Sequence, residues 1–487
     1  MRLLCQPFGG AARLQAKDIR LVKSDIESTD APAILAGKHD PYFSPRWLNA
    51  WHPACTWLVG SGRPIDARIA EGDLLSMTSG ARGTTTHGSS GRAKNVILMI
   101  GDGMGAAHRF AGQLVAAGRN GRLAMDRLPH LGQMHTLSID RETFVTDSAA
   151  AATAIATGMK TINGSVSMSV DGTPQPTMLE ILAQSGRATG LVTTCQLTDA
   201  TPAAFAAHVP HRSNQSEIAR QFVQDSRVDV LLGGGGAYWY PLGEPNPFSD
   251  PEPLRAMSRG TAGRLAEDAV DRGYRLATTA SGLQEAIASG DPRIVGLFAG
   301  QELFVQSAEG LGDVYDPAVS LAEMTSSAID VLSRRPEGFF LMVEESAIDR
   351  MAHRNNAPLT LKGVLELDRA VQVAVEFAAD RDDTLVIVTA DHETGGLAIA
   401  GSGDTPYPYE PGGGLLDTML AHEDGPFPVA DEPYGFVIGW ATTGHTAATV
   451  PVSAMGPGAE AISGTIENTD LFPIVLEAAG VHVRTGS

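Results

Sequence analysis

The chain has 487 residues, of which 43% are hydrophobic, and its 36 Lys and Arg against 56 Asp and Glu give a formal net charge of −20. This length allows one large domain or two to three ordinary ones, and the hydrophobic content excludes a chain that is disordered throughout. The negative charge argues against nucleic acid as a partner, because contacts to the phosphate backbone require a basic surface. It does not exclude a phosphorylated small molecule, because bound metal ions can reverse the local sign of the charge.

The sequence gives no sign of a membrane span or of a cysteine-based site. It has no apolar run of about 18 residues, and its start lacks the apolar stretch of a signal peptide. Either the chain is cytosolic or its recorded start is not the natural one. Cys5 and Cys55 either form one bridge or stay unpaired, and with Cys195 they are too few for a disulfide framework. Without a Cys-x-x-Cys motif, any metal must be held by oxygen and imidazole ligands.

The first 92 residues differ in character from the rest of the chain. Residues 1–77 contain three of the five tryptophans but no cluster of chemically reactive side chains, and residues 78–91 are rich in Ser, Gly and Thr. Such a composition is typical of a flexible linker. We therefore expect an N-terminal extension of unknown role at 1–92, followed by the main domain at 93–487.

Strand-like and helix-like segments alternate from Asn95 onward. Short apolar runs typical of buried parallel strands occur at 96–100, 190–194, 228–232, 294–298, 339–343 and 385–389. Helical stretches lie at 177–184, 215–224, 321–332 and 359–377. This alternation predicts an α/β fold with a central, mostly parallel sheet and helices on both faces. Segments 233–253 and 401–433, rich in Gly, Pro and Tyr, are expected to be long surface insertions.

Acidic and imidazole side chains recur just after the predicted strands, where open α/β sheets bind their ligands. Each has an ordinary explanation by itself: Asp102 as a turn or helix cap, and Asp349 with His353 as a salt bridge across one helical turn. Adjacent Asp391 and His392 cannot share one contact, which is harder to explain structurally. Together these residues predict a metal site. The candidate ligands are Asp102, Glu344, Asp349, His353, Asp391, His392 and His445.

Two further segments contain candidates for the reaction itself. Ser148 begins an alanine-rich helical stretch, where it is either a helix cap or a nucleophile aimed at a phosphate by the N-terminal NH groups. Asp199 and Thr201 precede a proline in what is either an ordinary turn or part of an oxygen-rich magnesium site. Arg212 is either solvated or a two-pronged ligand of a phosphoryl group.

These motifs, in this order, resemble those of the alkaline phosphatases. The resemblance extends from about residue 95 to 480 and includes 101–105, 147–149, 199–202, 343–344, 348–349, 390–392 and 444–446. It implies that 93–487 is a catalytic domain of the alkaline phosphatase type. It also implies a hydrolase that dephosphorylates small phosphate monoesters through a phosphoserine, with broad specificity and an alkaline optimum. Export to the periplasm or secretion, and a homodimer, are further expectations from the family.

The resemblance also implies a role for each residue. Ser148 is the expected nucleophile, and Arg212 is expected to hold the non-bridging phosphoryl oxygens. Two Zn²⁺ ions and one Mg²⁺ are expected. The first zinc would be bound by Asp349, His353 and His445, and the second by Asp102, Asp391 and His392. The magnesium would be bound by Asp102, Thr201 and Glu344, with Asp199 beside it. Four carboxylates (−4) and three divalent ions (+6) give a site charge of about +2, which suits a phosphate dianion.

Some residues depart from the family pattern or fall outside it. Arg350 follows a zinc ligand at a position where relatives vary, and we expect it to reach the phosphate through water and to affect product affinity or the pH optimum. Six other histidines match no ligand position and are expected to be structural or at the surface: His108, His135, His208, His211, His422 and His482.

Two other functions compete with this one. A related enzyme could cleave phosphodiesters or sulfate esters, although Ser148 lacks the Cys/Ser-x-Pro-x-Arg setting of sulfatases. A relative that only binds phosphate or metal would be catalytically silent, which the intact nucleophile and ligand set argue against.

Overall fold

The computed structural model describes residues 92–226, 228–248, 257–305, 314–401 and 425–482. Except for Arg92, the predicted N-terminal extension with its two cysteines and its linker lies outside the described residues, as do 249–253 and 402–424 of the two predicted insertions.

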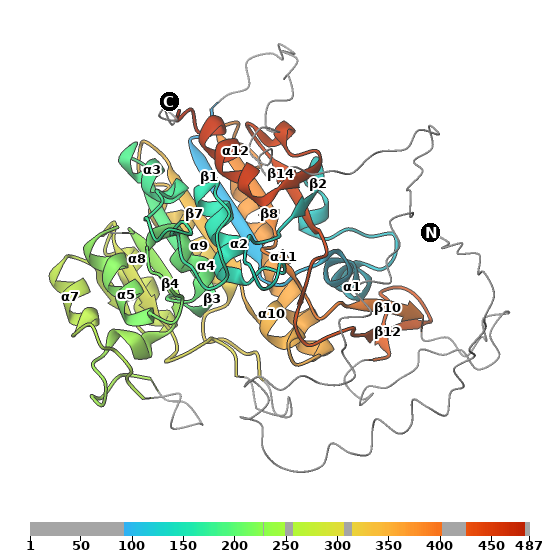
Figure 1. The fold of residues 1–487 in the computed structure, drawn as a ribbon, viewed down its shortest axis with the longest axis horizontal. Helices are drawn as coiled ribbons and strands as arrows, with labels where there is room; N and C mark the ends of the chain where they lie inside the picture. The colour runs from blue at the N-terminus through green and yellow to red at the C-terminus, as the bar shows by residue number, and fades with distance from the viewer. Residues whose placement is uncertain (1–91, 227, 249–256, 306–313, 402–424, 483–487) are drawn as a thin grey trace, which may run out of the picture. The chain divides into compact units, whose positions relative to one another are not determined.

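A ten-stranded sheet forms the centre of the described chain (Figure 1). Its strand order is β15-β2-β14-β8-β1-β7-β3-β4-β6-β5. All neighbouring pairs are parallel except those of β14, which runs antiparallel to β2 and β8. The bounds are β1 Asn95–Gly101, β2 His130–His135, β3 Ala188–Gln196, β4 Val230–Gly234, β5 Arg275–Ala277, β6 Ile294–Leu297, β7 Phe339–Glu345, β8 Thr384–Thr389, β14 Val450–Met455 and β15 Gly464–Glu467.

Helices cover both faces of this sheet. On one face α9 and α11 contact the strands, with α1 and α10 packed on α11; on the other lie α3 and α4, with α2 and α12 beside them. The helices are α1 Ala106–Ala117, α2 Ser148–Thr157, α3 Met178–Gln184, α4 Ala200–Ala206, α5 Gln215–Gln224, α7 Leu265–Asp271, α8 Ala280–Ala288, α9 Leu321–Leu332, α10 Ala347–Ala352, α11 Ala357–Ala378 and α12 Leu471–Ala478. The predicted α/β fold is thereby confirmed.

Short elements complete the described chain. The 3₁₀ turns are η2 Ala124–Asp126, η3 Gly236–Trp239, η4 Ala459–Ala461 and η5 Asn468–Asp470. Two small sheets are formed by β10 Ala398–Gly401, β12 Gly435–Gly439 and β11 Phe427–Pro428, and by β13 His445–Thr446 with β9 Glu393–Thr394.

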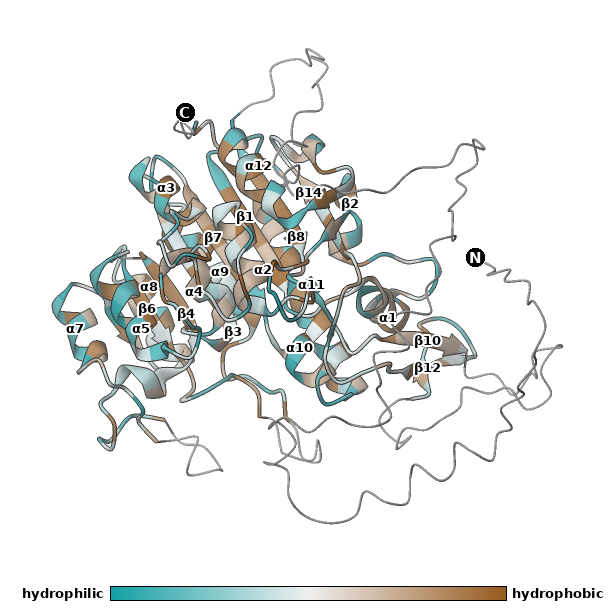
Figure 2. Cartoon of the chain, in the orientation of Figure 1, coloured by the Kyte–Doolittle hydropathy of each residue, from teal (hydrophilic) through white to brown (hydrophobic). Residues whose placement is uncertain are grey.

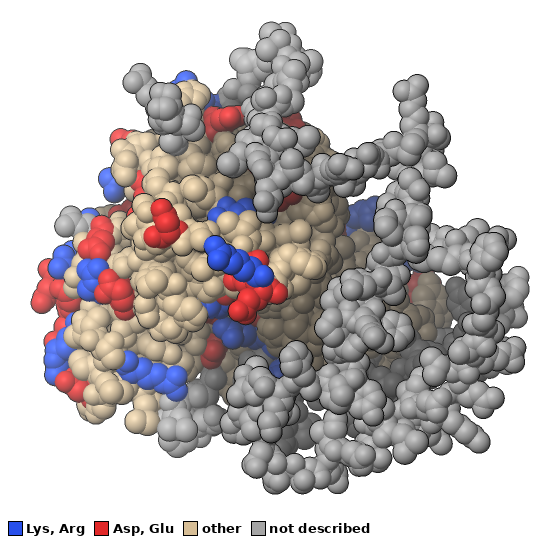
Figure 3. All heavy atoms as spheres, in the orientation of Figure 1, with Lys and Arg blue, Asp and Glu red and all other residues tan. Residues whose placement is uncertain are grey.

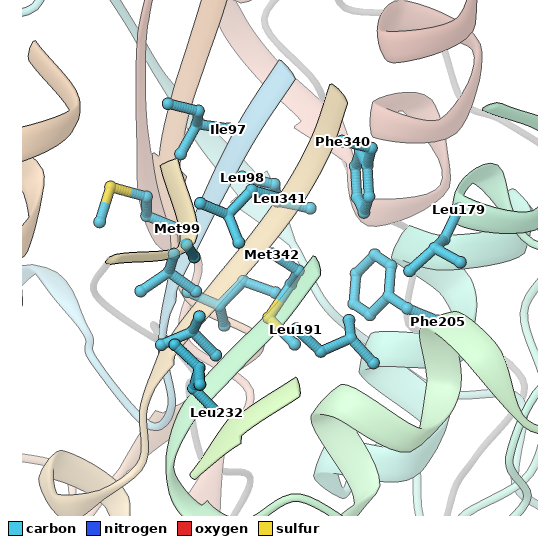
Figure 4. Close-up of a cluster of buried hydrophobic side chains, with 14 of the residues drawn as sticks. Ile97, Leu98, Met99, Leu179, Leu191, Phe205, Leu232, Phe340, Leu341 and Met342 are labelled. Carbon is cyan, nitrogen blue, oxygen red and sulfur yellow. The ribbon is translucent and has the colours of Figure 1, made fainter. Parts of the chain in front are cut away.

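The hydrophobic core lies on both faces of the central strands. Strands β1, β3, β7 and β8 are buried along their whole length, and Figure 2 shows hydrophobic residues, coloured brown, in the central sheet and in the helices packed on it. In Figure 4 the ring of Phe340 from β7 lies near that of Phe205 from α4, with a centroid distance of 5.9 Å. Burial on both sides explains why each of these strands contains a run of apolar residues.

The described part of the first predicted insertion is not wholly at the surface. Trp239 in η3 is fully buried and belongs to the main core cluster. Within the described residues, no helix has both the length and the apolar character needed to cross a membrane.

Candidate active site

The candidate ligands come together because their strands are neighbours. Strands β8, β1 and β7 are adjacent and parallel, so their carboxyl ends meet at one edge of the sheet. Asp102 follows β1, Glu344 is the second-to-last residue of β7, and Asp391 with His392 follows β8. The sheet topology therefore brings together side chains that are up to 290 positions apart (392 − 102).

A glycine allows two ligand-bearing turns to approach closely. Gly103 has a φ of +74°, and a Cβ at this position would lie 2.8 Å from the Cα of Asp349. Its backbone NH donates to Asp391 Oδ1 at 3.1 Å. Because a side chain here would be both strained and in collision, the turn after β1 requires glycine.

One group of candidate ligands lies at the rim of the site. Asp349 Oδ1 is 3.3 Å from His353 Nε2 and 3.5 Å from His445 Nε2, and the two Nε2 atoms are 3.1 Å apart. The Nδ1 atom of His353 is held by the Thr443 carbonyl, and that of His445 by the Thr146 carbonyl. Backbone contacts that fix one ring nitrogen and leave the other aimed at a common point are typical of metal-binding histidines. We call Asp349, His353 and His445 the rim group.

A second group is completely buried. His392 Nε2 lies 3.2 Å from Asp391 Oδ2 and 3.5 Å from Asp102 Oδ1, and all three residues are at most 2% exposed. We call Asp102, Asp391 and His392 the buried group. Asp349 is also within reach of Asp102 and His392, so it lies between the two groups. The rings of His392 and His445 are stacked, with centroids 3.6 Å apart.

Besides Asp102, the two other expected magnesium ligands are buried as well. Glu344 and Thr201 are each 1% exposed. Thr193 Oγ1 donates to Glu344 Oε2 at 2.5 Å, which leaves the other carboxylate oxygen of Glu344 available.

The donor atoms at these sites fit a bound cation. Within the described chain, four buried oxygens here have no hydrogen-bond partner: Asp102 Oδ1, Thr201 Oγ1, Glu344 Oε1 and Asp391 Oδ2. Unpaired buried oxygens are costly unless an ion or a water satisfies them. Without a cation, burial and the neighbouring carboxylates Asp391 and Asp349 raise the pKa of Asp102 well above its usual range.

The pKa values of the other two carboxyls follow the same pattern. Burial raises the pKa of Glu344 to about 8, and burial together with Asp349 raises that of Asp391 to about 6. Divalent ions would remove this electrostatic penalty, because they supply the positive charge that the buried carboxylates lack.

Ser148 lies where the buried group meets a helix N-terminus. It is the first residue of α2 and 3% exposed, and its Oγ is 3.2 Å from His392 Nε2. Asp147 is the helix cap, because its Oδ1 accepts from Ala150 N at 2.9 Å. The capping role that the sequence left open therefore belongs to Asp147, and the Ser148 hydroxyl points to the candidate ligands.

Two arginines flank the site and share one carboxylate. Arg212 Nη2 contacts Asp199 Oδ1 at 2.8 Å and its Nη1 contacts Asp147 Oδ2 at 3.2 Å, while Arg350 Nη2 contacts Asp199 Oδ2 at 2.6 Å. Although burial opposes it, these guanidinium groups hold the pKa of Asp199 well below its usual range. Asp199 is thereby kept ionised and fixes both arginines.

The arginines and Ser148 line a common cavity of about 450 Å³. Its lining residues are Ser148, Asp199, Arg212, Ser213, Gln215, Asp349, Arg350, His353 and His445. The cavity is much larger than a phosphoryl group, so it also leaves space for the group to which the phosphate is attached.

The structure also identifies a contact that the sequence reasoning missed. Thr394 Oγ1 donates to Asp349 Oδ1 at 2.5 Å and lies 3.3 Å from His392 Nδ1. It therefore touches one ligand of each group. In the sequence, Thr394 is marked only by its position two residues after the Asp391–His392 pair. A threonine at that position forms no recognisable motif.

The other histidines lie apart from these ligands or pair elsewhere. His208 contacts Glu180, and His211 contacts Ser213. His108 is fully buried near Glu393, whereas His135 and His482 are exposed. His422 lies outside the described residues.

The fold and the site together define a metal-dependent hydrolase. The alkaline phosphatase family model matches residues 93–409. Streptomycin-6-phosphate phosphatase of Streptomyces griseus is 37% identical over 84% of this chain and 96% of its own length. Alkaline phosphatase of Escherichia coli K12 is 33% identical over 86% of this chain and 94% of its own. The chain belongs to the alkaline phosphatase family, whose members are phosphomonoesterases.

Solved structures agree with this assignment. The alkaline phosphatase of the Antarctic bacterium TAB5 has a TM-score of 0.63 and 29% identity, covering 80% of this chain and 99% of that one. The Thermus thermophilus enzyme has a TM-score of 0.65 and 27% identity, covering 80% and 92%. A variant of the TAB5 enzyme, 30% identical with a TM-score of 0.63 and the same coverage, was solved with magnesium bound.

Proposed function

We propose that this phosphomonoesterase works through a phosphoserine at Ser148, with two Zn²⁺ ions and one Mg²⁺. The observation that carries the proposal is the position of Ser148 Oγ, 3.2 Å from His392 Nε2 and in the same cavity as Arg212. A hydroxyl in this position can attack a phosphoryl group that Arg212 holds in place.

Each of the three ligand sets would bind one metal ion. The rim group would hold one zinc, the buried group the other, and Asp102, Thr201 and Glu344 the magnesium, with Asp199 beside it. When bound, zinc lowers the pKa of a hydroxyl or water ligand and stabilises negative charge on oxygen.

The protein's own residues position the reacting groups. The N-terminus of α2 directs NH groups and positive dipole towards a phosphoryl group at Ser148. Arg212, fixed by Asp147 and Asp199, supplies the planar fork that matches two phosphoryl oxygens. Arg350 lines the same cavity and is held there by its contact with Asp199. We propose that it reaches the phosphate through water.

Broad specificity and an alkaline optimum follow from this arrangement. The charged residues of the site bind the phosphoryl group, and the remaining space in the cavity accommodates leaving groups of different size and shape. An attacking oxygen that must lose its proton favours high pH.

The test is hydrolysis of nitrophenyl phosphate from pH 6 to 11, before and after EDTA and again after Zn²⁺ and Mg²⁺ are restored. We expect activity that rises above pH 8, is lost on chelation and returns with zinc. Faster hydrolysis of bis-nitrophenyl phosphate or nitrophenyl sulfate would instead indicate the diesterase or sulfatase alternative. Phosphate binding without turnover under every metal loading would indicate the silent relative.

We also propose that the chain forms a homodimer. Phe110 on α1 and Leu131 on β2 are 47% and 58% exposed and line one shallow cavity with Arg109 and Pro451. Exposed apolar side chains that gather at one place are typical of interfaces between subunits. Light scattering of the wild type and of Leu131→Glu tests the proposal, and a monomeric wild type would contradict it.

The remaining expectations concern the partner and the compartment. On the face shown in Figure 3, acidic and basic side chains are interspersed among the coloured residues, which agrees with small phosphorylated substrates rather than nucleic acid as partners. We propose that the protein is periplasmic or secreted, as the family resemblance suggests. Cell fractionation tests this location, and recovery in the cytoplasmic fraction alone would contradict it.

A further inference from the structure

Glu345 is a buried carboxylate next to the candidate magnesium ligand Glu344, and none of the roles assigned above involves it. It is the last residue of β7 and 0% exposed. Its Oε1 accepts from Thr194 Oγ1 at 2.9 Å and from Ala347 N at 2.9 Å, and its Oε2 accepts from the Tyr315 hydroxyl. Three donors from three segments of the chain therefore converge on one side chain.

These contacts join elements that hold candidate ligands. Ala347 begins α10, a helix of six residues that carries Asp349 and ends beside His353. Thr194 lies in β3, beside the Thr193 that donates to Glu344. The backbone carbonyl of Glu345 also accepts from Asp102 N at 3.0 Å. Glu345 is thus bonded to the turns that present Asp102 and Asp349, and it adjoins Glu344.

The start of α10 depends on this carboxylate. Ser346 is the N-cap residue of α10, but its side chain makes no capping hydrogen bond. Glu345 Oε1 instead accepts the NH of Ala347, one of the helix NH groups that have no partner within the helix. A helix of less than two turns has few bonds of its own, so this contact contributes to fixing where Asp349 and His353 lie.

Tyr315 holds the other side of the carboxylate and is itself fixed. It is 2% exposed, its ring packs edge-on against Phe304 at 6.0 Å, and Lys362 lies over the ring at 5.5 Å and donates to its carbonyl. Just before it, Val314 and Val305 pair through two backbone hydrogen bonds, and Leu303 N donates to Thr194 O at 2.8 Å. The donor to Glu345 is therefore connected to β3 through the Val305–Val314 pair and Leu303.

We propose that Glu345 is a positioning residue of the metal site, which sets the relative places of Glu344, Asp349 and Asp102 through its bonds to Thr194, Ala347 and Tyr315. The inference rests on the proposed function, because it concerns the ligands assigned there. It adds a residue that touches neither metal nor substrate but fixes three carboxylates that would bind them. Contacts of this kind are worth about 10- to 100-fold in metal affinity or activity.

The experiment measures Zn²⁺ and Mg²⁺ dissociation constants of the full chain after metal depletion, by competition with a chromogenic chelator, together with the melting temperature. Glu345→Ala is expected to weaken metal binding about 10-fold or more. Glu345→Gln, which keeps an acceptor for Ala347 and Thr194, is expected to restore most of this affinity. Tyr315→Phe, which removes one donor, is expected to have an intermediate effect.

The control is Asp368→Asn. Asp368 is a partly buried carboxylate on α11 that accepts from Ala124 N at 3.1 Å and Met125 N at 3.0 Å. We expect it to lower the melting temperature without changing metal affinity. Equal loss of metal affinity in Asp368→Asn and Glu345→Ala would overturn the inference, because Glu345 would then be merely structural. So would wild-type affinity in Glu345→Ala.

If Glu345→Ala fails to fold, the metal affinity of Tyr315→Phe tests the inference instead. Unchanged metal affinity in that variant would overturn it. A wild-type chain that binds neither ion would instead contradict the proposed function itself, so the two failures are distinguishable.

Discussion

The buried group and the rim group use the same ligand types in opposite surroundings. His392 is fully buried, whereas the side chains of His353 and His445 are 33% and 16% exposed. Burial and nearby His445 lower the pKa of His392 well below its usual range. For His445, the hydrogen bond and charge of Asp349 outweigh burial and raise the pKa to about 9.

This difference indicates a division of work between the two groups. The buried group is in contact with Ser148 and closed to water, so it suits activation of the nucleophile. The rim group lines the cavity, so under the proposed mechanism it suits the departure of the leaving group and the entry of a water molecule. Asp349 belongs to the rim group by its contacts yet reaches the buried group, so the two are not independent.

The largest expected effect is that of Ser148→Ala. Removal of the nucleophile should lower kcat for nitrophenyl phosphate by at least about 1,000-fold. Metal content, measured by atomic emission, should stay unchanged, because no candidate ligand is removed. Near-wild-type turnover would show that the buried group serves some other chemistry.

Thr394→Ala tests the link between the two groups. Loss of its hydroxyl removes the hydrogen bond to Asp349 and the contact with His392, so zinc affinity should fall about 10- to 100-fold. Thr394→Ser retains the hydroxyl and is the matched control. If the alanine variant binds zinc as tightly as the serine variant, the hydroxyl plays no part in orienting these ligands.

Arg212→Ala and Arg350→Ala compare the two arginines at the rim. Loss of charge-assisted hydrogen bonds worth about 1.5 to 3 kcal/mol should weaken inhibition by inorganic phosphate about 10- to 100-fold in Arg212→Ala. Arg350→Ala should have a smaller effect, because we expect Arg350 to act through water and through Asp199. Inhibition constants measured at fixed pH and saturating metal check this order, and a larger effect of Arg350→Ala would reverse the assigned roles.

The smallest effect concerns the His208–Glu180 pair, which lies away from both groups. Burial lowers the pKa of His208, but its bonds to Glu180 and to the Ser167 carbonyl raise it overall. A raised pKa stabilises the fold below the unfolded value of about 6.5, and this contribution is lost as pH rises through the folded value. His208→Gln should therefore cost about 1 kcal/mol or less at pH 5.5 and less still above pH 8.

Urea unfolding at the two pH values checks this prediction. The kinetics of His208→Gln should match the wild type throughout, which separates a stability effect from an effect on the metal groups. A larger loss of stability at high pH than at low pH would show that the sign of the pKa shift is wrong.

The central strands were predictable because burial on both faces gives each of them a run of apolar residues. All six predicted runs correspond to strands of the sheet, as in β1 and β7. The four strands that were not predicted lie towards the edges of the sheet: β2, β5, β14 and β15. The residues of β2 alternate between exposed and at least partly buried and include two histidines, so no apolar run marks it.

The candidate site was predictable where chemistry is concentrated in short motifs. Asp391 with His392, and Asp349 with His353, are recognisable in the sequence, and the structure places them together with Asp102 and Ser148. Thr394 and Glu345 were not recognised, because their importance comes from contacts with segments distant in the chain. Such contacts depend on tertiary packing, which spacing along the sequence does not encode.

The most direct test of the account is to trap the phosphoenzyme. The metal-loaded protein is mixed with nitrophenyl phosphate, quenched in acid within the first turnovers, digested and analysed by mass spectrometry. We predict one phosphate on the peptide that contains Ser148, absent in Ser148→Ala. Steady turnover with no phosphate on any peptide, or with phosphate on another residue, would contradict the account.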